Sequence, residues 1–367
     1  YKRQVPVGTC LSGGIDSSAI ACLINDTKRA EIKTFSAVFP GFSQDEAKYI
    51  DLVAEKTGMS NFKVKPTASS LVQDLEGFIS RIGEPVPSPS PYSQYCVQRL
   101  AKENDVTVLL DGQGSDELFA GYHYFYGFYF KHLLRGLRIG TFLRELAALI
   151  RGGQFRIGVL SVLFLMTPLF VRSYYFEHKS NISEELLHDN EARTGFFESY
   201  YTCGSLHEAL EFHMRYKLEH LLKWEDRNSM AHSREARVPF LDYRIVEFVS
   251  GLPERFIIHS GMTKAILRDA MRGTVPEEIL DRRDKIGFAA PEDDWLRSGE
   301  MRELLEEWFI RERPISAPFI DLERTRRMIH EHLARRRGHG RALWRTLFLE
   351  AWMRVFFDGA LWRCPGD

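Results

Sequence analysis

The feature that most constrains the fold is the alternation of short apolar, β-branched runs with helical patterns along the first third of the chain. The runs expected to form strands are residues 5–11, 33–39, 62–65 and 106–110. Helical patterns at about residues 17–24, 45–57 and 92–104 separate them, and Gly58 is expected to end the second. This alternation is typical of βαβ units, whose strands form a parallel sheet. We therefore predict an α/β fold with a doubly wound parallel sheet.

The remainder of the chain has a different pattern. From about residue 121 it becomes mostly helical, so we predict a boundary near residue 122, with the α/β part at 1–122 and a mainly helical part at 123–367. The proline-rich segment 84–91 predicts a loop, because proline cannot continue a helix interior. Apolar side chains three or four apart between residues 343 and 356 predict a C-terminal helix that packs into the core.

Charge and cysteine content exclude several classes of protein. The 49 basic and 50 acidic residues give a formal net charge of -1, which argues against a globally basic nucleic-acid binder. The five cysteines include no CxxC pair, so neither a zinc ribbon nor a disulfide framework is indicated. The histidines show no HExxH or HxH spacing, so no zinc site is expected. A reducing, cytoplasmic location fits this composition best.

Membrane insertion is not expected either. No signal peptide pattern opens the chain, which begins at Tyr1 without a methionine and reads as a piece of a longer protein. The most apolar stretch, residues 157–171, is shorter than the ~20 residues of a spanning helix and contains Pro168. We expect a buried helix there, with a segment resting on a membrane surface as the alternative.

The strongest chemical signal is the segment Ser12-Gly13-Gly14-Ile15-Asp16-Ser17-Ser18, between the first expected strand and helix. Two glycines allow a tight turn whose N–H groups can approach an anion, and the helix N-terminus adds partial positive charge. The segment has no lysine, so it is not a GxxxxGK[ST] loop. Asp16 would be repelled by phosphate unless a divalent cation lay between them. The segment therefore predicts a site for magnesium pyrophosphate.

The sequence resembles the N-type ATP pyrophosphatases, whose loop reads SGGxDS, and among them the synthetase domain of asparagine synthetases. The resemblance covers nearly the whole chain. Besides residues 12–17 it rests on four motifs: DGQGSDELFAG at 111–121, EARVPFLD at 235–242, GMTKAILR at 261–268 and RRDKIGF at 282–288. It implies the adenine nucleotide α-hydrolase-like fold, with ATP and Mg²⁺ as cofactors.

The resemblance also implies roles for individual residues. Asp16 and Asp116 resemble the family's pair of magnesium carboxylates. Lys264 resembles its catalytic lysine, which would stabilise negative charge on the α-phosphorus and on the later tetrahedral intermediate. Lys285 is a further candidate for the phosphates. The remaining nucleotide contacts that the resemblance implies are Ser12, Gly13, Gly14 and Ser17 for the pyrophosphate, and the backbone of Leu11, Val38 and Gly112 for adenosine.

The chain departs from the asparagine synthetase pattern SGEGxDE. Asp111 stands where serine is common, and Gln113 stands where glutamate is common. An amide can hydrogen-bond but cannot act as a base. Either a neighbouring acid such as Glu117 replaces that glutamate, or the chain uses a different amine acceptor. We therefore hold Gln113 and Glu117 as candidate catalytic residues.

The resemblance also indicates what accompanies this chain. Glutamine-dependent members begin with a glutaminase domain whose N-terminal cysteine is the nucleophile, and no such domain precedes Tyr1. Cys10 lies inside the first expected strand and is interpreted as a small buried side chain. We expect a glutaminase domain upstream in the parent protein, free ammonia as the nitrogen source for this chain alone, and leave a homodimer open.

Two charged segments remain ambiguous from sequence. The segment Trp224-Glu225-Asp226-Arg227-Asn228 predicts either a buried ion network or, through Asp226, a contact with the substrate. Glu235 and Arg237 are expected to brace the site. The arginine run between residues 324 and 345 is expected to be a solvated helix face, and no nucleic-acid partner is expected.

The sequence thus favours an ATP-dependent synthetase. It would adenylate a small-molecule carboxylate, the aspartate side chain above all, and join it to ammonia, giving asparagine, AMP and pyrophosphate. Within the same family the alternative is amide formation on another metabolite or a peptide, as in β-lactam synthetases and lasso-peptide cyclases. Outside it, the alternatives are a tRNA-modifying pyrophosphatase and a non-catalytic binding module.

Overall fold

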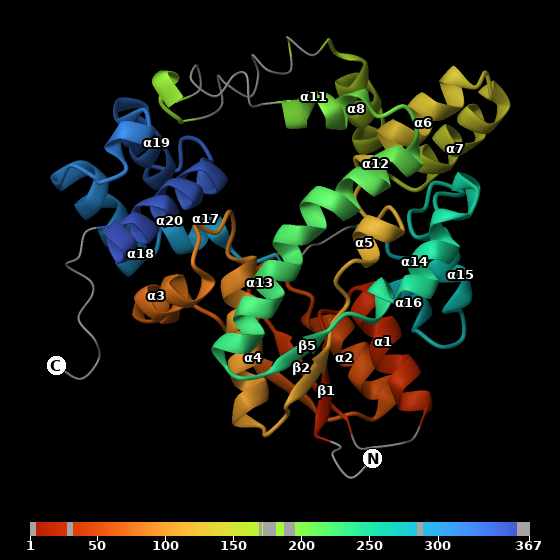
Figure 1. Ribbon diagram of the computed structural model, residues 1–367, viewed down its shortest axis with the longest axis horizontal. Helices are drawn as coiled ribbons and strands as arrows, with labels where there is room; N and C mark the ends of the chain where they lie inside the picture. Colours follow the sequence, from red (N-terminus) through yellow and green to blue (C-terminus); the bar gives the residue numbers. More distant parts are fainter. Residues whose placement is uncertain are drawn as a thin grey trace.

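A five-stranded parallel sheet forms the base of the molecule in the computed structural model (Figure 1). The structure describes residues 5–27, 32–168, 171, 181–186, 195–284 and 289–357. The strands are β1 (Val7–Cys10), β2 (Lys33–Ala37), β3 (Asn61–Val64), β4 (Val108–Leu110) and β5 (Glu235–Arg237). Their order across the sheet is β3-β2-β1-β4-β5, and every neighbouring pair is parallel.

The strand order places the candidate loops side by side. The chain runs from β1 outward to β2 and β3, and then returns to add β4 on the other side of β1. In such sheets a crevice forms where the order of strand addition reverses. It opens at the carboxyl ends of the strands, where ligands bind. The segments that follow β1 and β4, residues 11–14 and 111–114, therefore meet at this crevice.

Helices account for most of the remaining described chain (Figure 1). Around the sheet lie α1 (Ile15–Asp26), α2 (Ala47–Thr57), α3 (Ala68–Ile82), α4 (Ser90–Glu103) and the short α5 (Ser115–Leu118). The following helices are α6 (Phe125–Arg135), α7 (Ile139–Arg151), α8 (Phe155–Met166), α11 (Gly195–Thr202), α12 (Leu206–Phe212), α13 (Leu218–Ala231), α14 (Tyr243–Ser250), α15 (Ala265–Ala270) and α16 (Glu277–Leu280). The last are α17 (Glu292–Leu296), α18 (Gly299–Glu306), α19 (Leu322–Leu333) and α20 (Gly340–Phe357).

The two faces of the sheet contact different layers. Cys10, in β1, packs in one buried cluster with Val97 of α4, whereas its neighbour Leu11 packs in another with Ile50 of α2. Adjacent residues of an extended chain point to opposite faces, so helices cover the sheet on both sides. The prediction of a doubly wound parallel α/β fold is confirmed.

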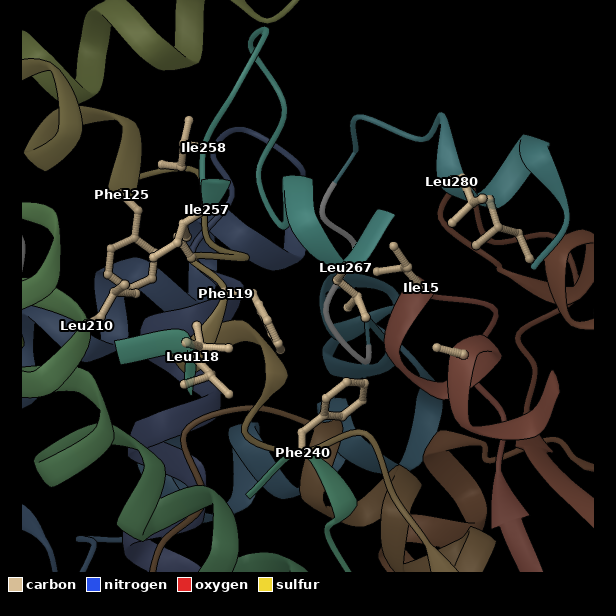
Figure 2. Close-up of a cluster of buried hydrophobic side chains, with 14 of the residues drawn as sticks. Ile15, Leu118, Phe119, Phe125, Leu210, Phe240, Ile257, Ile258, Leu267 and Leu280 are labelled. Carbon is tan, nitrogen blue, oxygen red and sulfur yellow. The ribbon is translucent and has the colours of Figure 1, made fainter. Parts of the chain in front are cut away.

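The cluster on the α1 side continues into the helical part of the chain (Figure 2). Figure 2 shows Ile15 of α1 in one cluster with Leu118 and Phe119 at the end of α5 and with side chains from the helical part of the chain. Those labelled from the helical part are Phe125, Leu210, Phe240, Ile257, Ile258, Leu267 and Leu280. A continuous buried cluster therefore holds the phosphate-loop helix against the segment that carries Lys264.

A second buried cluster joins the C-terminal helices to the first third of the chain. Phe348 of α20 lies edge-on to Phe78 of α3, with ring centroids 6.5 Å apart. Trp344 stacks on Phe348 at 4.6 Å, and both side chains are fully buried. The prediction that the C-terminal apolar stripe packs into the core is confirmed for these two residues, while Phe356 is 39% exposed.

The predicted strands are confirmed, with ends that differ by at most two residues. Gly58 ends α2 as expected, in a left-handed conformation with φ of 69°. The loop predicted for residues 84–91 is shorter, because α4 already begins at Ser90. Pro91 lies in the first turn of α4, where the missing N–H breaks no helical hydrogen bond.

Two elements were absent from the sequence prediction. Helix α3 begins with a capping box, in which Thr67 and Ser70 bond to each other's backbone N–H groups, and Gly83 ends it. Strand β5 comes from the EARVPFLD motif and adds to β4, with Val108 opposite Glu235. A strand of three residues whose pairing partner lies far away in the chain has no local sequence pattern from which it could be predicted. The sheet therefore takes a strand from beyond residue 122, and the boundary at that position stays a prediction.

The prediction of a buried helix at residues 157–171 is wrong for the part that the structure describes. Leu160, Leu163 and Met166 on α8 are 53%, 57% and 69% exposed. Among the described residues α8 packs mainly on α6 and α7, and the side of the apolar helix that carries Leu160 and Leu163 is exposed. Hydrophobicity alone does not reveal how many neighbours a helix will have. Among the described residues, no helix is long and apolar enough to cross a membrane.

Candidate functional site

The loop between β1 and α1 is closed by its two serines. The Ser17 hydroxyl accepts from the Ser12 N–H at 3.1 Å and lies 3.1 Å from the Ser12 hydroxyl. Gly13 adopts a φ of 76°, and a Cβ there would lie 2.9 Å from the Cβ of Tyr49. Gly14 is the N-cap of α1 and provides no side-chain cap. The first turn of α1 therefore opens towards the crevice with uncapped N–H groups, which favour an anion.

Lys264 joins this loop to the one that follows β4. Its Nζ lies 2.6 Å from both carboxylate oxygens of Asp16 and 2.5 Å from Oδ1 of Asp116. The Ser115 hydroxyl donates to Asp16 at 2.6 Å. Lys264 is 2% exposed, so three charged groups from three segments meet in a space almost free of water. Electrostatic interactions are strong in such an environment.

The backbone around Lys264 is held in an uncommon conformation. Lys264 itself has a φ of 54°, in the left-handed region that non-glycine residues seldom occupy, and its N–H donates to the Phe119 carbonyl at 3.1 Å. Gly121 lies against the same cluster. A Cβ at Gly121 would be 1.9 Å from Oδ1 of Asp116 and 2.5 Å from Cε of Lys264. Glycine is therefore the residue that permits the close approach of these chains.

Arginines complete the wall of the site. Arg282 donates to the Gly13 carbonyl at 3.0 Å and to Glu46 at 2.8 Å, and its guanidinium lies 3.9 Å from the Tyr49 ring centroid. Arg268 is bonded through Nε to the Thr263 carbonyl at 2.8 Å. A cavity of about 40 Å³ opens between the phosphate loop and these groups. Its lining residues are Gly14, Ile15, Asp16, Glu46, Gly121, His123, Thr263, Lys264, Arg268, Ile279, Arg282, Arg283 and Asp284.

Glu117 is buried next to Asp116. Its carboxylate accepts from the Tyr122 hydroxyl at 2.6 Å, and burial together with the Asp116 charge raises its pKa. Lys217 lies beside the same group, with Nζ 3.2 Å from the Tyr122 ring centroid and 2.8 Å from the Tyr124 hydroxyl to which it donates. Lys217 ends a π-helical turn, His213–Lys217, a distortion often found at functional sites.

Gln113 and Asp111 belong to a second polar cluster beneath the turn after β4. Burial raises the pKa of the Asp111 carboxyl, and the neighbouring backbone N–H groups of Gly112 and Gln113 partly offset this rise. Glu225 of α13 is 2% exposed, and burial together with the Asp111 charge raises its pKa well above the ordinary value. Cys10 is 7% exposed, so its interpretation as a small buried side chain is confirmed, and burial raises the pKa of its thiol.

The three predicted adenosine contacts lie at the carboxyl ends of β1, β2 and β4. The Leu11 N–H donates to the Phe35 carbonyl at 2.8 Å, and the Val38 N–H donates to the Val64 carbonyl at 3.0 Å. Gly112 lies against the phosphate loop, since a Cβ there would be 2.9 Å from the Cβ of Asp16. The fold thus brings the three segments to one edge, and their roles stay predictions.

The structure separates the residues of the segment 224–228. Asp226 is exposed on α13, whereas Glu225 and Asn228 are 2% and 1% exposed. Trp224 donates to Glu84 at 2.6 Å and Arg227 to the Ile82 carbonyl at 2.7 Å, so this stretch ties α13 to the end of α3. Asp226 is not brought to the Lys264 cluster, and its substrate role stays a prediction. Lys285 lies outside the described residues.

The remaining ambiguous charges lie at the surface. Arg237 donates to Glu235 at 2.7 Å, and both side chains are more than half exposed. In the arginine run, Arg327 of α19 and Arg335, Arg336, Arg337, Arg341 and Arg345 are exposed. The expectation of a solvated face is confirmed for these positions.

The donor set suits a divalent cation bound together with phosphate. Asp16 and Asp116 already bring their carboxylates to one cation, the Lys264 ammonium. Magnesium prefers oxygen ligands and is usually held by one or two carboxylates plus phosphate oxygens and water. Among the described residues, no group of three or more His, Cys, Asp or Glu side chains could hold a metal by itself. The chain therefore offers a two-carboxylate site that needs ligand oxygens for completion.

Sequence reasoning missed several residues of the site individually. Arg268, Arg282 and Gly121 lie inside the motifs that carried the resemblance, but only Lys264 and Lys285 were singled out there. Glu225 lies in a segment that the sequence left ambiguous. The available signal was the set of motifs as a whole, because neither the ion pairs nor the close approach of Gly121 can be read from residue types.

Comparison with known proteins gives a consistent result. A family model described as asparagine synthase matches residues 1–354. Asparagine synthetase [glutamine-hydrolyzing] 1 of Bacillus subtilis (strain 168) is 30% identical over 372 residues, covering 96% of this chain and 57% of that protein.

Two further relatives carry different names. A putative glutamine-hydrolysing asparagine synthetase of Mycobacterium bovis is 30% identical, over 97% of this chain and 56% of its own length. A protein of Penicillium rubens named amidase chyE is 23% identical, over 90% of this chain and 56% of its own length. The chain thus spans little more than half the length of the curated relatives it matches.

Proposed function

The chain belongs to the asparagine synthase family, and from this and the site geometry we propose that it is the synthetase part of an ATP-dependent amide-forming ligase. The observation that carries the proposal is the meeting of Lys264 with Asp16 and Asp116 at the mouth of an uncapped, glycine-rich phosphate loop. This arrangement suits a reaction that develops negative charge on phosphorus beside a departing pyrophosphate.

The first step joins a carboxylate to AMP. A carboxylate oxygen of the substrate attacks the α-phosphorus of ATP, the bond to the β-phosphate breaks, and pyrophosphate leaves. The N–H groups at the start of α1 hold the departing phosphates, and Arg282 braces the loop through the Gly13 carbonyl. Lys264 offers its ammonium to the charge on the α-phosphate. Magnesium, held by Asp16 and Asp116, would neutralise phosphate charge.

In the second step ammonia attacks the acyl carbon of the adenylate. The carbon–nitrogen bond forms, the bond to AMP breaks, and the nitrogen loses one proton. Lys264 would also stabilise the oxyanion of the tetrahedral intermediate, because the acyl carbon of the adenylate is joined to the α-phosphorus through a single oxygen. The burial of Lys264 limits the access of water, which would otherwise hydrolyse the adenylate.

We propose the aspartate side chain as the carboxylate and asparagine as the product, since the relatives from Bacillus subtilis and Mycobacterium bovis carry the name asparagine synthetase. The relative named an amidase supports the second candidate, amide formation on another metabolite or a peptide. The lengths of the relatives support a glutaminase domain as the partner that supplies ammonia in the whole protein. We also propose a cytoplasmic location, and leave a homodimer open.

One assay tests the proposal. The protein is incubated with ATP, Mg²⁺, ammonium and single carboxylic acids, beginning with aspartate. Pyrophosphate and AMP are measured, and the amide is identified by mass spectrometry. Carboxylate-dependent release of pyrophosphate supports the proposal, and asparagine as product supports the first candidate. Release of ADP and orthophosphate instead, or release of pyrophosphate only with tRNA, would contradict it.

A further inference from the structure

A second cavity lies beside the C-terminal helices, and the proposed reaction does not use it. It has a volume of about 690 Å³ and opens between one face of α19, the loop after that helix and the first turn of α20. Four arginines line it, Arg324, Arg327, Arg337 and Arg341, and we call it the arginine cavity. Its volume is within the range of sites that bind small molecules.

The arginine cavity is separate from the candidate site. The two cavities share no lining residue. Figure 1 shows α19 and α20 (blue) on the left of the molecule. It shows α1, which carries Asp16, and α15, which begins after Lys264, on the right. A ligand in the arginine cavity is therefore bound apart from the phosphate loop.

Positive charge dominates the lining of this cavity. Its one acidic residue is Glu331 of α19, whose Oε2 lies 2.6 Å from Nε2 of His339. With His339 neutral, four guanidinium groups and one carboxylate give the lining a formal charge of +3. Within the described part of the chain, Arg327 and Arg337 form no ion pair, and both are exposed. These two guanidinium groups are therefore open to an anion.

Two acids of α17 lie behind the lining, and both already face arginines. Oδ2 of Asp293 lies 3.8 Å from Nη2 of Arg297, and Oε2 of Glu292 lies 3.7 Å from Nε of Arg341. A Cβ at Gly340 would lie 2.0 Å from Oδ1 of Asp293, so this carboxylate lies against the start of α20. An anion in the cavity would therefore be held by the guanidinium groups and not by the end of the helix.

The loop that carries Arg337 is fixed by hydrogen bonds. The N–H groups of Arg336 and Arg337 donate to the Glu331 carbonyl at 2.9 and 3.4 Å. The N–H of His339 donates to Nδ1 of the buried His332 at 3.1 Å. The cavity is thus formed before any ligand arrives, which reduces the entropy lost on binding.

The lining offers many donors and few acceptors. Arginine has five N–H donors and no acceptor, and the carboxylate of Glu331 already lies at hydrogen-bond distance from His339. A peptide would bring N–H groups that find few partners here, and burying them unpaired is costly. A phosphate group brings oxygen acceptors and pairs with guanidinium through two parallel hydrogen bonds. The donor set therefore favours phosphate over an acidic peptide.

The lining also lacks a surface on which a nucleobase could stack. None of its residues is Phe, Tyr or Trp, and single-stranded nucleic acid is held largely by such stacking. We propose that the arginine cavity binds a small anion with several phosphate groups, either a free phosphate chain or the phosphate chain of a nucleotide. This inference goes beyond the proposed function and does not depend on it.

Titration calorimetry with tripolyphosphate tests the proposal. The buffer has low salt and contains EDTA, so the two carboxylates at the phosphate loop have no divalent cation to bridge them to phosphate. We expect one tripolyphosphate to bind per chain, with an affinity that falls as salt is added. For R327A/R337A we expect the affinity to fall at least about tenfold, because each guanidinium contributes charge-assisted hydrogen bonds.

A matched control is R335A/R336A. It removes two exposed arginines of the same loop that do not line the cavity, so its affinity should stay within about twofold of the unaltered protein. E331Q removes the acid of the lining and keeps an oxygen near His339, so it should bind tripolyphosphate about threefold more tightly. ATP in the same buffer distinguishes the two sources, since the tighter of the two ligands identifies a nucleotide or a free phosphate chain.

Three outcomes would overturn the proposal. The first is no binding of tripolyphosphate at low salt. The second is an equal loss of affinity in R335A/R336A and R327A/R337A, which would indicate attraction to the whole basic face. The third is tighter binding of an oligoglutamate peptide or of a short single-stranded RNA than of tripolyphosphate. None of them bears on the proposed function, which concerns the phosphate loop and Lys264.

Discussion

At the scale of single residues, Lys264 and Gly121 show how closely the site is packed. Lys264 supplies the positive charge between two carboxylates, and Gly121 supplies the space in which they meet. The sequence motifs predicted the importance of Lys264. They did not predict that Gly121 is required by the same cluster, because its role depends on a distance between two segments far apart in the chain.

Replacing Lys264 by methionine should remove catalysis. We expect K264M to lower the rate of amide formation by roughly 10²–10³-fold, as for loss of one oriented donor in a buried site. Its thermal midpoint should also fall, since Asp16 and Asp116 would face each other without the ammonium. Steady-state kinetics and calorimetry measure both effects. K63M, which breaks the exposed pair with Asp51, is the control and should change neither.

Replacing Gly121 by alanine should displace the carboxylate of Asp116. The new Cβ would lie 1.9 Å from Oδ1 of Asp116, so we expect G121A to abolish pyrophosphate release and weaken binding of Mg²⁺-ATP by at least about tenfold. Titration calorimetry checks the affinity. A Cβ at Gly140 of α7 would meet no atom within 4 Å beyond its own stretch of helix, so G140A should bind normally. Unchanged binding in G121A would contradict the close approach.

At the scale of elements, α13 links three parts of the site. It contacts α4 through Glu225 and Asn228, the end of α3 through Trp224 and Arg227, and β5 follows it directly. Helical patterns predicted α1, α2 and α4 but missed α3, and they could not decide the orientation of α13. Asp226 and Glu225 are adjacent in sequence, and only packing places one outside and the other inside.

The Glu225–Asp111 pair should make stability depend on pH. Both folded-state pKa values are raised, so their contribution to stability is fully present below the unfolded values, about 4. It is lost as pH rises through the folded values. We expect the thermal midpoint of the protein to fall on the alkaline side and the fall to be smaller in E225Q. Thermal denaturation of both proteins across pH checks this, and parallel curves would contradict a raised pKa of Glu225.

Helix α8 allows a test of its uncovered side. Leu160 and Leu163 are more than half exposed, so the double substitution L160E/L163E should change the free energy of unfolding by less than about 1 kcal/mol. Leu133 of α6 is 2% exposed, and L133A should cost roughly 2–5 kcal/mol. Chemical denaturation of the three proteins gives the comparison. A large loss of unfolding free energy in the double variant would contradict the exposed side of α8 and support the buried helix that the sequence predicted.

At the scale of the whole molecule, the nucleotide-binding part is built with material from the second half. β5 extends the sheet beside β4, and α20 packs on α3 through Phe348 and Phe78. Figure 1 shows the C-terminal helices (blue) beside α3 (orange), although the two lie far apart in the sequence. The predicted boundary at residue 122 marks a change in the sequence pattern. Strand pairing and side-chain packing both continue across it.

A fragment of residues 1–122 should therefore fail to fold alone. Its α3 and α4 would expose Phe78 and Tyr92, which Phe348 of α20 and Trp295 of α17 contact in the whole chain. We expect it to lack a cooperative thermal transition and to be degraded rapidly by protease, whereas residues 1–357 should resist under the same conditions. A cooperative, protease-resistant fragment would establish 1–122 as an independent domain.

The sequence by itself determined the strand–helix alternation, which is typical of a parallel sheet, and the phosphate loop, because both patterns lie in residues close together in the chain. Only the tertiary structure decided which distant groups meet: Lys264 with Asp16 and Asp116, Arg282 with Gly13, and Glu225 with Gln98. Periodicity and turn chemistry act locally, whereas the position of a buried charge depends on the partner that compensates its loss of hydration. That partner is chosen by packing.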